Sequence, residues 1–178
     1  FVMITLAGES AKRIVEVITE KSTLTNPENP VYTVKDGSIS FENVSFKYSE
    51  KAERMALSNI NLQIRSGETI GIIGGTGSSK STLVQLIPRL YDATEGTVKV
   101  GGVDVRNYDL DTLRNQVAVV LQKNILFSGT IKENLRWGNK DATDEELVEA
   151  CRLACADEFI SQFPKGYDTY VEQGGANL

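Results

Sequence analysis

The chain has 178 residues, of which 40% are hydrophobic and 24% are charged, which are ordinary proportions for a soluble globular domain. Its net charge of -5 argues against a surface devoted to nucleic acid, which needs a basic stripe. No apolar run reaches the roughly 18 to 20 residues that a membrane span requires. With two cysteines and no histidine, the chain cannot close a tetrahedral zinc site by thiols alone, and reduced thiols suit a cytosolic compartment.

The first segment has apolar residues at alternating spacings of three and four from Ile4 to Ile18, which predicts one helix with a narrow apolar stripe. Such a helix either docks on its own domain or is the cytosolic tail of a transmembrane helix that begins before Phe1. The polar stretch that follows contains Pro27 and Pro30, which favour an extended connection.

Alternating apolar residues then predict a small β layer. Residues 38–48 alternate with one slip at 42–43, which indicates a strand with a bulge, and residues 60–64 form a second strand before a turn at 66–68. Valines on both sides of Gly101 and Gly102 predict a tight hairpin. Asp109 is expected to cap a short helix that runs through Arg114.

Between these elements lies the most informative segment. The apolar run 69–73 predicts a strand, and the small residues after it predict a phosphate-binding loop that opens a helix with apolar spacing as far as Leu90. Pro88 is expected to kink or shorten that helix. Clustered backbone N–H groups and a helix N-terminus favour phosphates, Lys80 adds a mobile charge for the outer phosphates, and the Ser81 hydroxyl is a ligand for Mg²⁺.

The residues predicted to hold the nucleotide in this loop are Gly75, Thr76, Gly77, Ser78, Ser79, Lys80, Ser81 and Thr82. The strict pattern has a glycine where this chain has Ser79. The alternative interpretation is an ordinary glycine-rich turn before a helix.

The run 117–121 lacks alternation and predicts a strand buried on both faces, with Gln122 at its carboxyl end on the same rim as the phosphate loop. The alternative is a glutamine that merely starts a surface loop. Further on, a capping box at 143–146 predicts a helix to about Ala156, on which Cys151 and Cys155 share one face as small buried residues.

Taken together, these residues resemble the nucleotide-binding domain of ATP-binding cassette transporters of the exporter branch, from about Ser38 to Leu178. The resemblance is carried by the aromatic segment 46–48, the phosphate loop, the segment 119–122 and the run 127–135 after it, and residues 10–17 are similar to the linker of fused exporters. It implies an α/β fold: a P-loop NTPase core with an N-terminal antiparallel β layer and a helical subdomain, incomplete at the C-terminus.

The resemblance also implies roles for single residues. Tyr48 would stack on adenine, although an aromatic at a strand end is often core filler. Gln122 would join Ser81 in binding Mg²⁺ and sense the terminal phosphate, and Glu172 would lie in a loop that touches the membrane domains. The family signature begins at Leu178, so we expect no catalytic residue within this chain and no ATPase activity from these residues alone.

The resemblance implies three parts: a helix continuing from a transmembrane segment (1–22), a linker (23–37) and the N-terminal part of the nucleotide-binding domain (38–178). Its implied cofactors are ATP and Mg²⁺. Its implied partners are the transmembrane domains and a second nucleotide-binding domain, of the same or of a different subunit, at the cytoplasmic face of the cell membrane, without nucleic acid. The expected function is ATP-driven export.

Two alternatives remain open at this point. One is a weakly hydrolysing regulatory subunit of a heterodimeric exporter, which the departure at Ser79 brings to mind. The other is a soluble ATPase of the same family outside transport, against which the linker helix and the run 127–131 argue.

Overall fold

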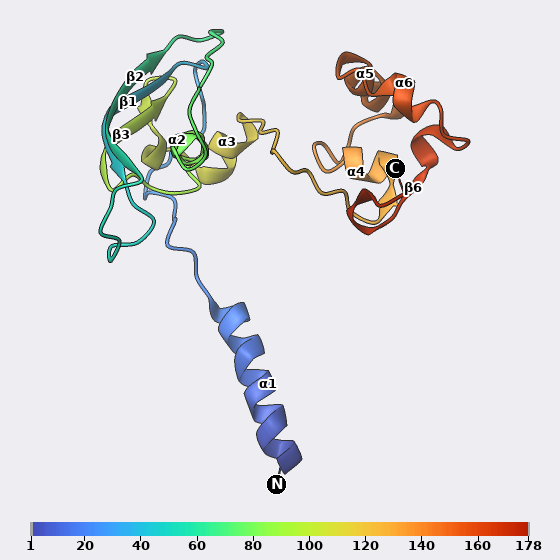
Figure 1. The fold of residues 1–178 in the computed structure, drawn as a ribbon, viewed down its shortest axis with the longest axis horizontal. Helices are drawn as coiled ribbons and strands as arrows, with labels where there is room; N and C mark the ends of the chain where they lie inside the picture. Colours follow the sequence, from blue (N-terminus) through green and yellow to red (C-terminus); the bar gives the residue numbers. More distant parts are fainter. Residues whose placement is uncertain (1, 178) are drawn as a thin grey trace. The chain divides into compact units, whose positions relative to one another are not determined.

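The computed structural model describes the backbone of residues 2–177 and the side chains of residues 8–177. The chain divides into two compact units, Phe1–Ala118 (unit 1) and Val119–Leu178 (unit 2) (Figure 1). The Ile4 and Ala7 side chains of the expected apolar stripe, and Leu178 where the family signature would begin, lie outside the described residues.

Unit 1 is built on an antiparallel sheet of β1 (Ile39–Phe46), β2 (Leu57–Ile64), β3 (Glu95–Val100) and β4 (Val103–Asp104), in the order β2-β1-β3-β4. The predicted bulge is confirmed, because the register of β1 shifts between Phe41 and Val44 and Asn43 has a φ of 50°. Gly96 faces this bulge, and a Cβ there would lie 2.3 Å from the Asn43 carbonyl oxygen. Only glycine therefore fits at that point of β3.

The predicted hairpin is also confirmed. Gly101 and Gly102 join β3 to β4 with φ values of 56° and 79°, as a two-residue turn with both residues in the left-handed region requires. After η1 (Val105–Asn107) comes α3 (Leu110–Asn115), where the Asp109 side chain accepts a hydrogen bond from the Thr112 amide as a cap.

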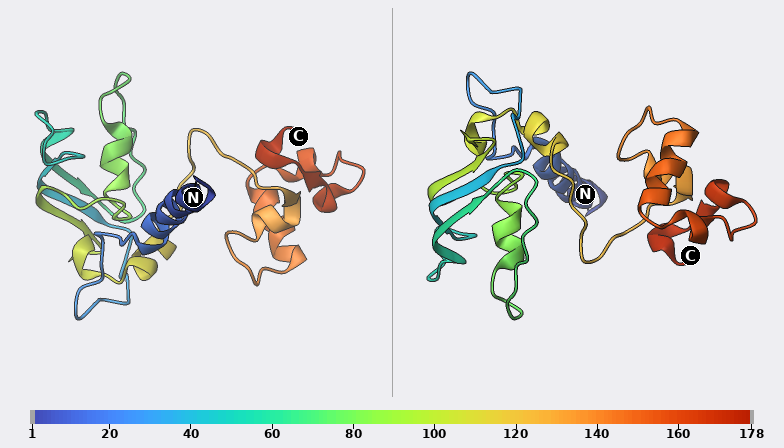
Figure 2. Two further views of the ribbon diagram at one scale, coloured as in Figure 1. Left: turned by 90° about the horizontal axis from the view of Figure 1, so that it is seen from below. Right: turned by 90° about the horizontal axis from the view of Figure 1, so that it is seen from above.

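The core of unit 1 lies between the sheet and the helix α2 (Lys80–Gln85), which covers one face of the sheet (Figure 2). Its fully buried side chains come from the strands, from the turn after α2, from the residue after η1 and from α3, and include Phe41, Val44, Leu86, Tyr108 and Leu113. The Tyr108 hydroxyl donates to the Val100 carbonyl at 2.8 Å, and burial raises the pKa of this hydroxyl. This core fixes the base on which the phosphate loop sits.

The first helix, α1 (Val2–Thr19), forms as predicted, and its side chains from Gly8 onward are exposed. None of the helices in residues 2–177 is long and apolar enough to cross a membrane. The choice between a docking helix and the tail of a transmembrane helix stays a prediction.

Two strand predictions are wrong. Residues 69–73 and 117–121 have no regular secondary structure, and Ile73 and Val120 are 99% and 90% exposed. A strand exists only where neighbouring strands complete its hydrogen bonds, and within residues 2–177 no segment pairs with either run. The helix after the loop is short as Pro88 predicts, because α2 ends at Gln85 and turns continue to Leu90.

Unit 2 pairs β5 (Gly129–Thr130) with β6 (Tyr170–Val171) and carries three helices, α4 (Ile131–Leu135), α5 (Asp144–Leu153) and α6 (Asp157–Ile160). The 3₁₀ turns η2 (Gly166–Asp168) and η3 (Gln173–Gly175) complete it. Its buried core contains Ile131, Cys151, Ile160 and Val171.

Capping and ion pairing hold the helices of unit 2. The predicted capping box at Thr143 and Glu146 is confirmed, and Thr130 and Glu133 form a second one at α4. Lys132 in α4 and Arg136 directly after it form ion pairs with Asp144 at the start of α5, and these pairs connect the two helices. Hydrogen bonds from Lys132, and to a smaller extent from Arg136, lower the pKa of Asp144.

The prediction that the two cysteines share one buried helix face is wrong. Cys151 is buried in α5, but the helix ends at Leu153, and Cys155 is exposed with a φ of 56°. The chain turns there because Cys155 leaves the helical region, and the Ala156 amide returns to the Cys151 carbonyl at 2.8 Å.

Candidate nucleotide-binding site

The glycine-rich segment forms an exposed loop that runs into the N-terminus of α2. Gly77 and Ser79 have φ values of 83° and 62°, and Ser79 is the residue before the first helical position, Lys80. The Ser78 amide donates to the Gly75 carbonyl at 3.3 Å. Two nearby residues in the left-handed region turn successive amides of the loop, and such a turn at a helix N-terminus is a favourable place for an anion.

Lys80 lies over this loop. Its Nζ donates to the carbonyl oxygens of Gly74 at 2.7 Å and Gly75 at 2.8 Å, and to the Ser78 Oγ at 3.2 Å. A Cβ on Gly74 would lie 2.7 Å from the same Ser78 Oγ, so a larger residue there would displace the Ser78 hydroxyl from its place beside Lys80. The ammonium group is therefore held above the loop, where it can exchange carbonyl oxygens for phosphate oxygens.

The base side of the site centres on Tyr48. Its hydroxyl lies 2.8 Å from the Thr82 Oγ1 in α2, which links the end of the β layer to the first turn after the loop. The Tyr48 ring packs edge to face with Phe46 (centroids 4.9 Å apart) and with Tyr91 (5.2 Å apart), yet the residue is 57% exposed. The ring is thus positioned by neighbours and still has surface on which a base can stack.

A cavity of about 560 Å³ lies beside Tyr48. One wall consists of residues 20–24 at the end of α1 and the start of the linker, and the other consists of Phe46, Tyr48, Leu90, Tyr91 and Asp92. Sequence reasoning missed the first wall, because nothing in a polar linker indicates which surface it will contact.

The other predicted site residues lie in unit 2 or at the helix start. Ser81 is exposed next to Lys80, as a metal ligand must be. Gln122 is exposed in an irregular segment of unit 2, and its predicted place on the rim of the phosphate loop stays a prediction. Glu172 is exposed, and its amide donates to the Asn177 Oδ1 at 2.7 Å.

The residues present fit a nucleoside triphosphate. The loop offers amides and the Lys80 ammonium group for the phosphates. The Tyr48 ring and the cavity beside it offer an apolar face for the base. Among the side chains that the structure describes, residues 8–177, there is no group of three acidic, cysteine or histidine residues that could hold a metal. Mg²⁺ fits such a site through the Ser81 hydroxyl together with phosphate oxygens, since it usually takes few protein ligands.

These features define an α/β protein with a phosphate-binding loop at the start of a helix. The family described as ABC transporter matches residues 57–172, and the chain belongs to this family. The family resemblance and the expected fold class are thereby confirmed.

Curated relatives agree. The chain is 43% identical over 170 residues to the ABC transporter ATP-binding protein YknV of Bacillus subtilis, covering 95% of this chain and 28% of the relative. It is 44% identical over 170 residues to the putative multidrug export ATP-binding/permease protein YgaD of the same organism, covering 95% of this chain and 29% of the relative. The chain thus spans less than a third of these relatives.

Among solved structures, a bacterial Atm1-family ABC exporter with ATP bound superposes with a TM-score of 0.87 at 30% identity. The match covers 98% of this chain and 30% of that one.

Proposed function

We propose that this chain is the ATP-binding part of an exporter in which ATP binding and hydrolysis drive a substrate across a membrane. The observation that carries the proposal is the Lys80 ammonium group held over the Gly74 and Gly75 carbonyls at the N-terminus of α2. It stands in a chain whose relatives include proteins named for multidrug export. Those names do not favour the alternative of a weakly hydrolysing regulatory subunit.

In this proposal the residues of the loop divide the work. The amides from Gly75 to Thr82 hold the phosphates, and Lys80 moves from the loop carbonyls to the outer phosphates. Ser81 and Gln122 are the protein ligands of Mg²⁺, and Tyr48 stacks on the adenine. Bound Mg-ATP supplies a phosphoryl group for transfer to water, and we assign no catalytic group for that step to residues 1–178.

The proposal also covers the surroundings of the site. Residues 1–22 continue a transmembrane segment, 23–37 link it to the domain, and 38–178 form the N-terminal part of that domain at the cytoplasmic face of the membrane. Partners are the transmembrane domains, which Glu172 approaches, and a second nucleotide-binding domain that completes the ATP site. The exposed pair Phe127 and Trp137, with ring centroids 5.0 Å apart, supports a protein-contact role for this part of unit 2.

The test is titration of the full-length protein with a labelled ATP analogue. Lys80→Ala is expected to weaken binding, because it removes a charge-assisted contact worth about 1.5–3 kcal/mol. Lys35→Ala is the matched control, since Lys35 is an exposed lysine of the same unit outside the loop. Equal affinity of the wild type and Lys80→Ala would remove the assignment.

A further inference from the structure

The two walls of the cavity beside Tyr48 come from segments far apart in the chain. One is residues 20–24, which lie between the end of α1 and the first linker residues, and the other includes residues 90–92, directly after the turns that follow α2. Among the residues that line the two walls, only Phe46, at the end of β1, belongs to a helix or strand. Something else must hold the walls at their spacing.

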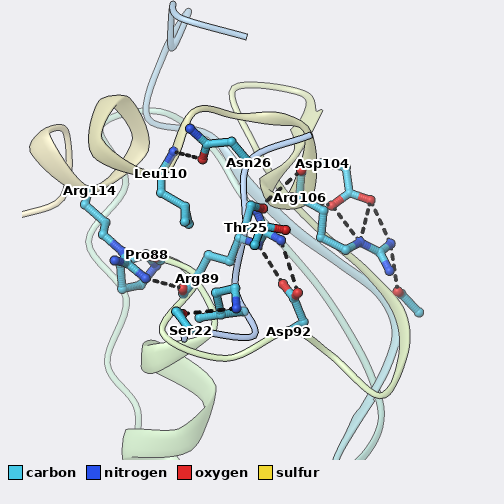
Figure 3. Close-up of polar contacts among 12 residues, drawn as sticks. Ser22, Thr25, Asn26, Pro88, Arg89, Asp92, Asp104, Arg106, Leu110 and Arg114 are labelled. Carbon is cyan, nitrogen blue, oxygen red and sulfur yellow. Dashed lines mark hydrogen bonds and ion pairs between the residues drawn. The ribbon is translucent and has the colours of Figure 1, made fainter. Parts of the chain in front are cut away.

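Arg89 occupies the position from which both walls are reached. It is 5% exposed, and its guanidinium forms two hydrogen bonds to Asp92, from Nε to Oδ1 at 2.7 Å and from Nη2 to Oδ2 at 3.1 Å. Its Nη1 donates to the Thr25 carbonyl at 3.2 Å and to the Arg106 carbonyl at 3.4 Å. Figure 3 shows Arg89 between Thr25 and Asp92. Thr25 directly follows the last residue of the first wall, Leu24, and Asp92 belongs to the second wall.

Arg89 is itself held in place. Its φ is 51°, in the left-handed region, which is unfavourable for a residue with a side chain. The Arg114 side chain donates to the carbonyls of Pro88 at 3.3 Å and Arg89 at 2.9 Å, so α3 fixes the backbone on both sides of that turn (Figure 3). A buried cation with a bidentate carboxylate and carbonyl partners is well satisfied, and loss of the carboxylate would leave a buried charge unpaired.

The linker has two further anchors on the same unit. The Asn26 side chain donates to Asp109 and accepts from the Leu110 amide at 3.0 Å, so it joins the cap of α3. Farther on, the Val31 amide donates to the Asn107 carbonyl at 2.8 Å, and the Asp109 amide donates to the Val31 carbonyl at 3.1 Å. The linker is therefore attached at Thr25, Asn26 and Val31 rather than free.

We propose that Arg89 is a positioning residue of the nucleotide site: with Asn26 it clamps the linker against unit 1, so that residues 20–24 form a wall beside the base-stacking Tyr48. The inference rests on the proposed function, because it assigns a role to the linker in binding the base end of ATP. Turns run without interruption from Lys80 to Arg89, through the Ile87 amide bonded to Val84 and the Arg89 amide bonded to Leu86. The clamp therefore joins the phosphate loop and the incoming helix α1 in one connected structure.

A positioning role for Arg89 predicts a different effect on ligand binding from a purely structural role. Loosening the linker removes a wall at the base end of the site and leaves the phosphate loop unchanged. Affinity for ATP should therefore fall while affinity for inorganic tripolyphosphate, which has no base, should not. Lys80→Ala, in contrast, should weaken both ligands.

The experiment compares Arg89→Lys, Asn26→Ala and Arg106→Lys in the full-length protein. Lysine keeps the charge at position 89 but loses the fork that reaches Asp92 and Thr25 together. Arg106→Lys is the matched control, because the Arg106 side chain forms a similar fork on Asp104 at 2.7 Å and donates otherwise to Gly96 and Thr97. The substitution keeps the Arg106 backbone carbonyl, which accepts from Arg89. The readouts are hydrogen exchange of the peptide 23–31, and binding of ATP and of tripolyphosphate.

We expect Arg89→Lys and Asn26→Ala to speed exchange of the linker peptide by about tenfold, the effect of losing one hydrogen bond to a charged group, and to weaken ATP binding by about the same factor. Tripolyphosphate binding and the Arg106→Lys variant should match the wild type. If Arg89→Lys does not fold, Asn26→Ala decides alone, since Asn26 is exposed and the Asp109 cap remains.

Two results would overturn the inference and leave the proposed function intact: a loosened linker with unchanged ATP affinity, or an equal loss for ATP and tripolyphosphate. Absence of ATP binding by the wild type would instead reject the proposed function itself.

Discussion

Ser79 is the residue at which the phosphate loop departs from the strict motif, and its backbone explains why the motif prefers glycine. Its φ of 62° and ψ of 24° place it in the left-handed region, and its side chain makes no capping hydrogen bond to α2. For a residue with a Cβ this conformation costs on the order of 1 kcal/mol. The serine is accommodated, with strain stored beside Lys80.

Ser79→Gly is therefore expected to stabilise the domain by about 1 kcal/mol and to raise its unfolding midpoint. Thermal unfolding of the full-length protein measures this. Ser79→Ala is the control, since it removes the hydroxyl and keeps the Cβ. A rise with alanine as large as with glycine would mean that the hydroxyl, and not the left-handed backbone, is the source of strain.

Tyr48 allows its two interactions to be separated. Tyr48→Phe removes the hydrogen bond to Thr82 at 2.8 Å and keeps the ring, whereas Tyr48→Ala removes both. We expect alanine to weaken ATP and GTP binding alike, by about 1–3 kcal/mol for a lost base–aromatic contact, and phenylalanine to retain most of the affinity. Competition of the labelled analogue by each nucleotide provides the measurement. Wild-type affinity in the alanine variant would exclude Tyr48 as the stacking platform.

At the scale of elements, the capping box of α5 is a self-contained device. Thr143 accepts from the Glu146 amide at 3.2 Å, and the Glu146 carboxylate accepts from the Thr143 amide at 2.9 Å. The helix that it opens buries Leu147 and Cys151. The cap thus helps to fix the core of unit 2.

Thr143→Ala is expected to cost about 1 kcal/mol and to speed hydrogen exchange in residues 144–153 about fivefold. Thr143→Ser keeps the hydroxyl and should leave exchange close to the wild type. A serine variant that exchanges as fast as the alanine variant would show that packing of the threonine methyl group, and not the cap, protects the helix.

The elements that the sequence predicts correctly are those whose cause is local. The hairpin at Gly101 and Gly102, the bulge in β1 and the caps at Asp109 and Thr143 each depend on residues a few positions apart. The short second capping box at Thr130 was within reach of the same reasoning, because its Thr-x-x-Glu spacing is identical.

Distant contacts were out of reach. The attachment of the linker depends on Arg89, whose only local signal is an aspartate three residues later, and that spacing says nothing of Thr25, 64 residues away. The strand predictions at 69–73 and 117–121 failed for a related reason. Apolar β-branched runs give a strand only in the presence of pairing partners, and pairing is a property of the sheet rather than of the run.

At the scale of the whole molecule, these two runs are the most unusual feature of unit 1 and its boundary with unit 2. The run 69–73 directly precedes the phosphate loop, and the run 117–121 directly precedes Gln122. Ile73 and Val120 within them are almost completely exposed. Apolar segments with unpaired backbone groups are unfavourable in water and prone to pair with other chains. In the full-length protein we therefore expect both runs to be paired as strands, with slow hydrogen exchange at residues 70–73 and 118–121.

The unpaired runs bear on the ATPase activity of residues 1–178 when they are produced alone. The segment that enters the loop lacks the hydrogen bonds of a sheet within residues 2–177, and electrostatic stabilisation of phosphoryl transfer depends on groups held in position before the reaction. Phosphate release from residues 1–178 with Mg-ATP should therefore stay at background even at high protein concentration, while the full-length protein turns over. The Lys80→Ala variant of each sets the background. Steady release from residues 1–178 that disappears in Lys80→Ala would show that the two runs need no pairing for catalysis. Fast hydrogen exchange at residues 70–73 in the full-length protein would show that this run is not a strand there.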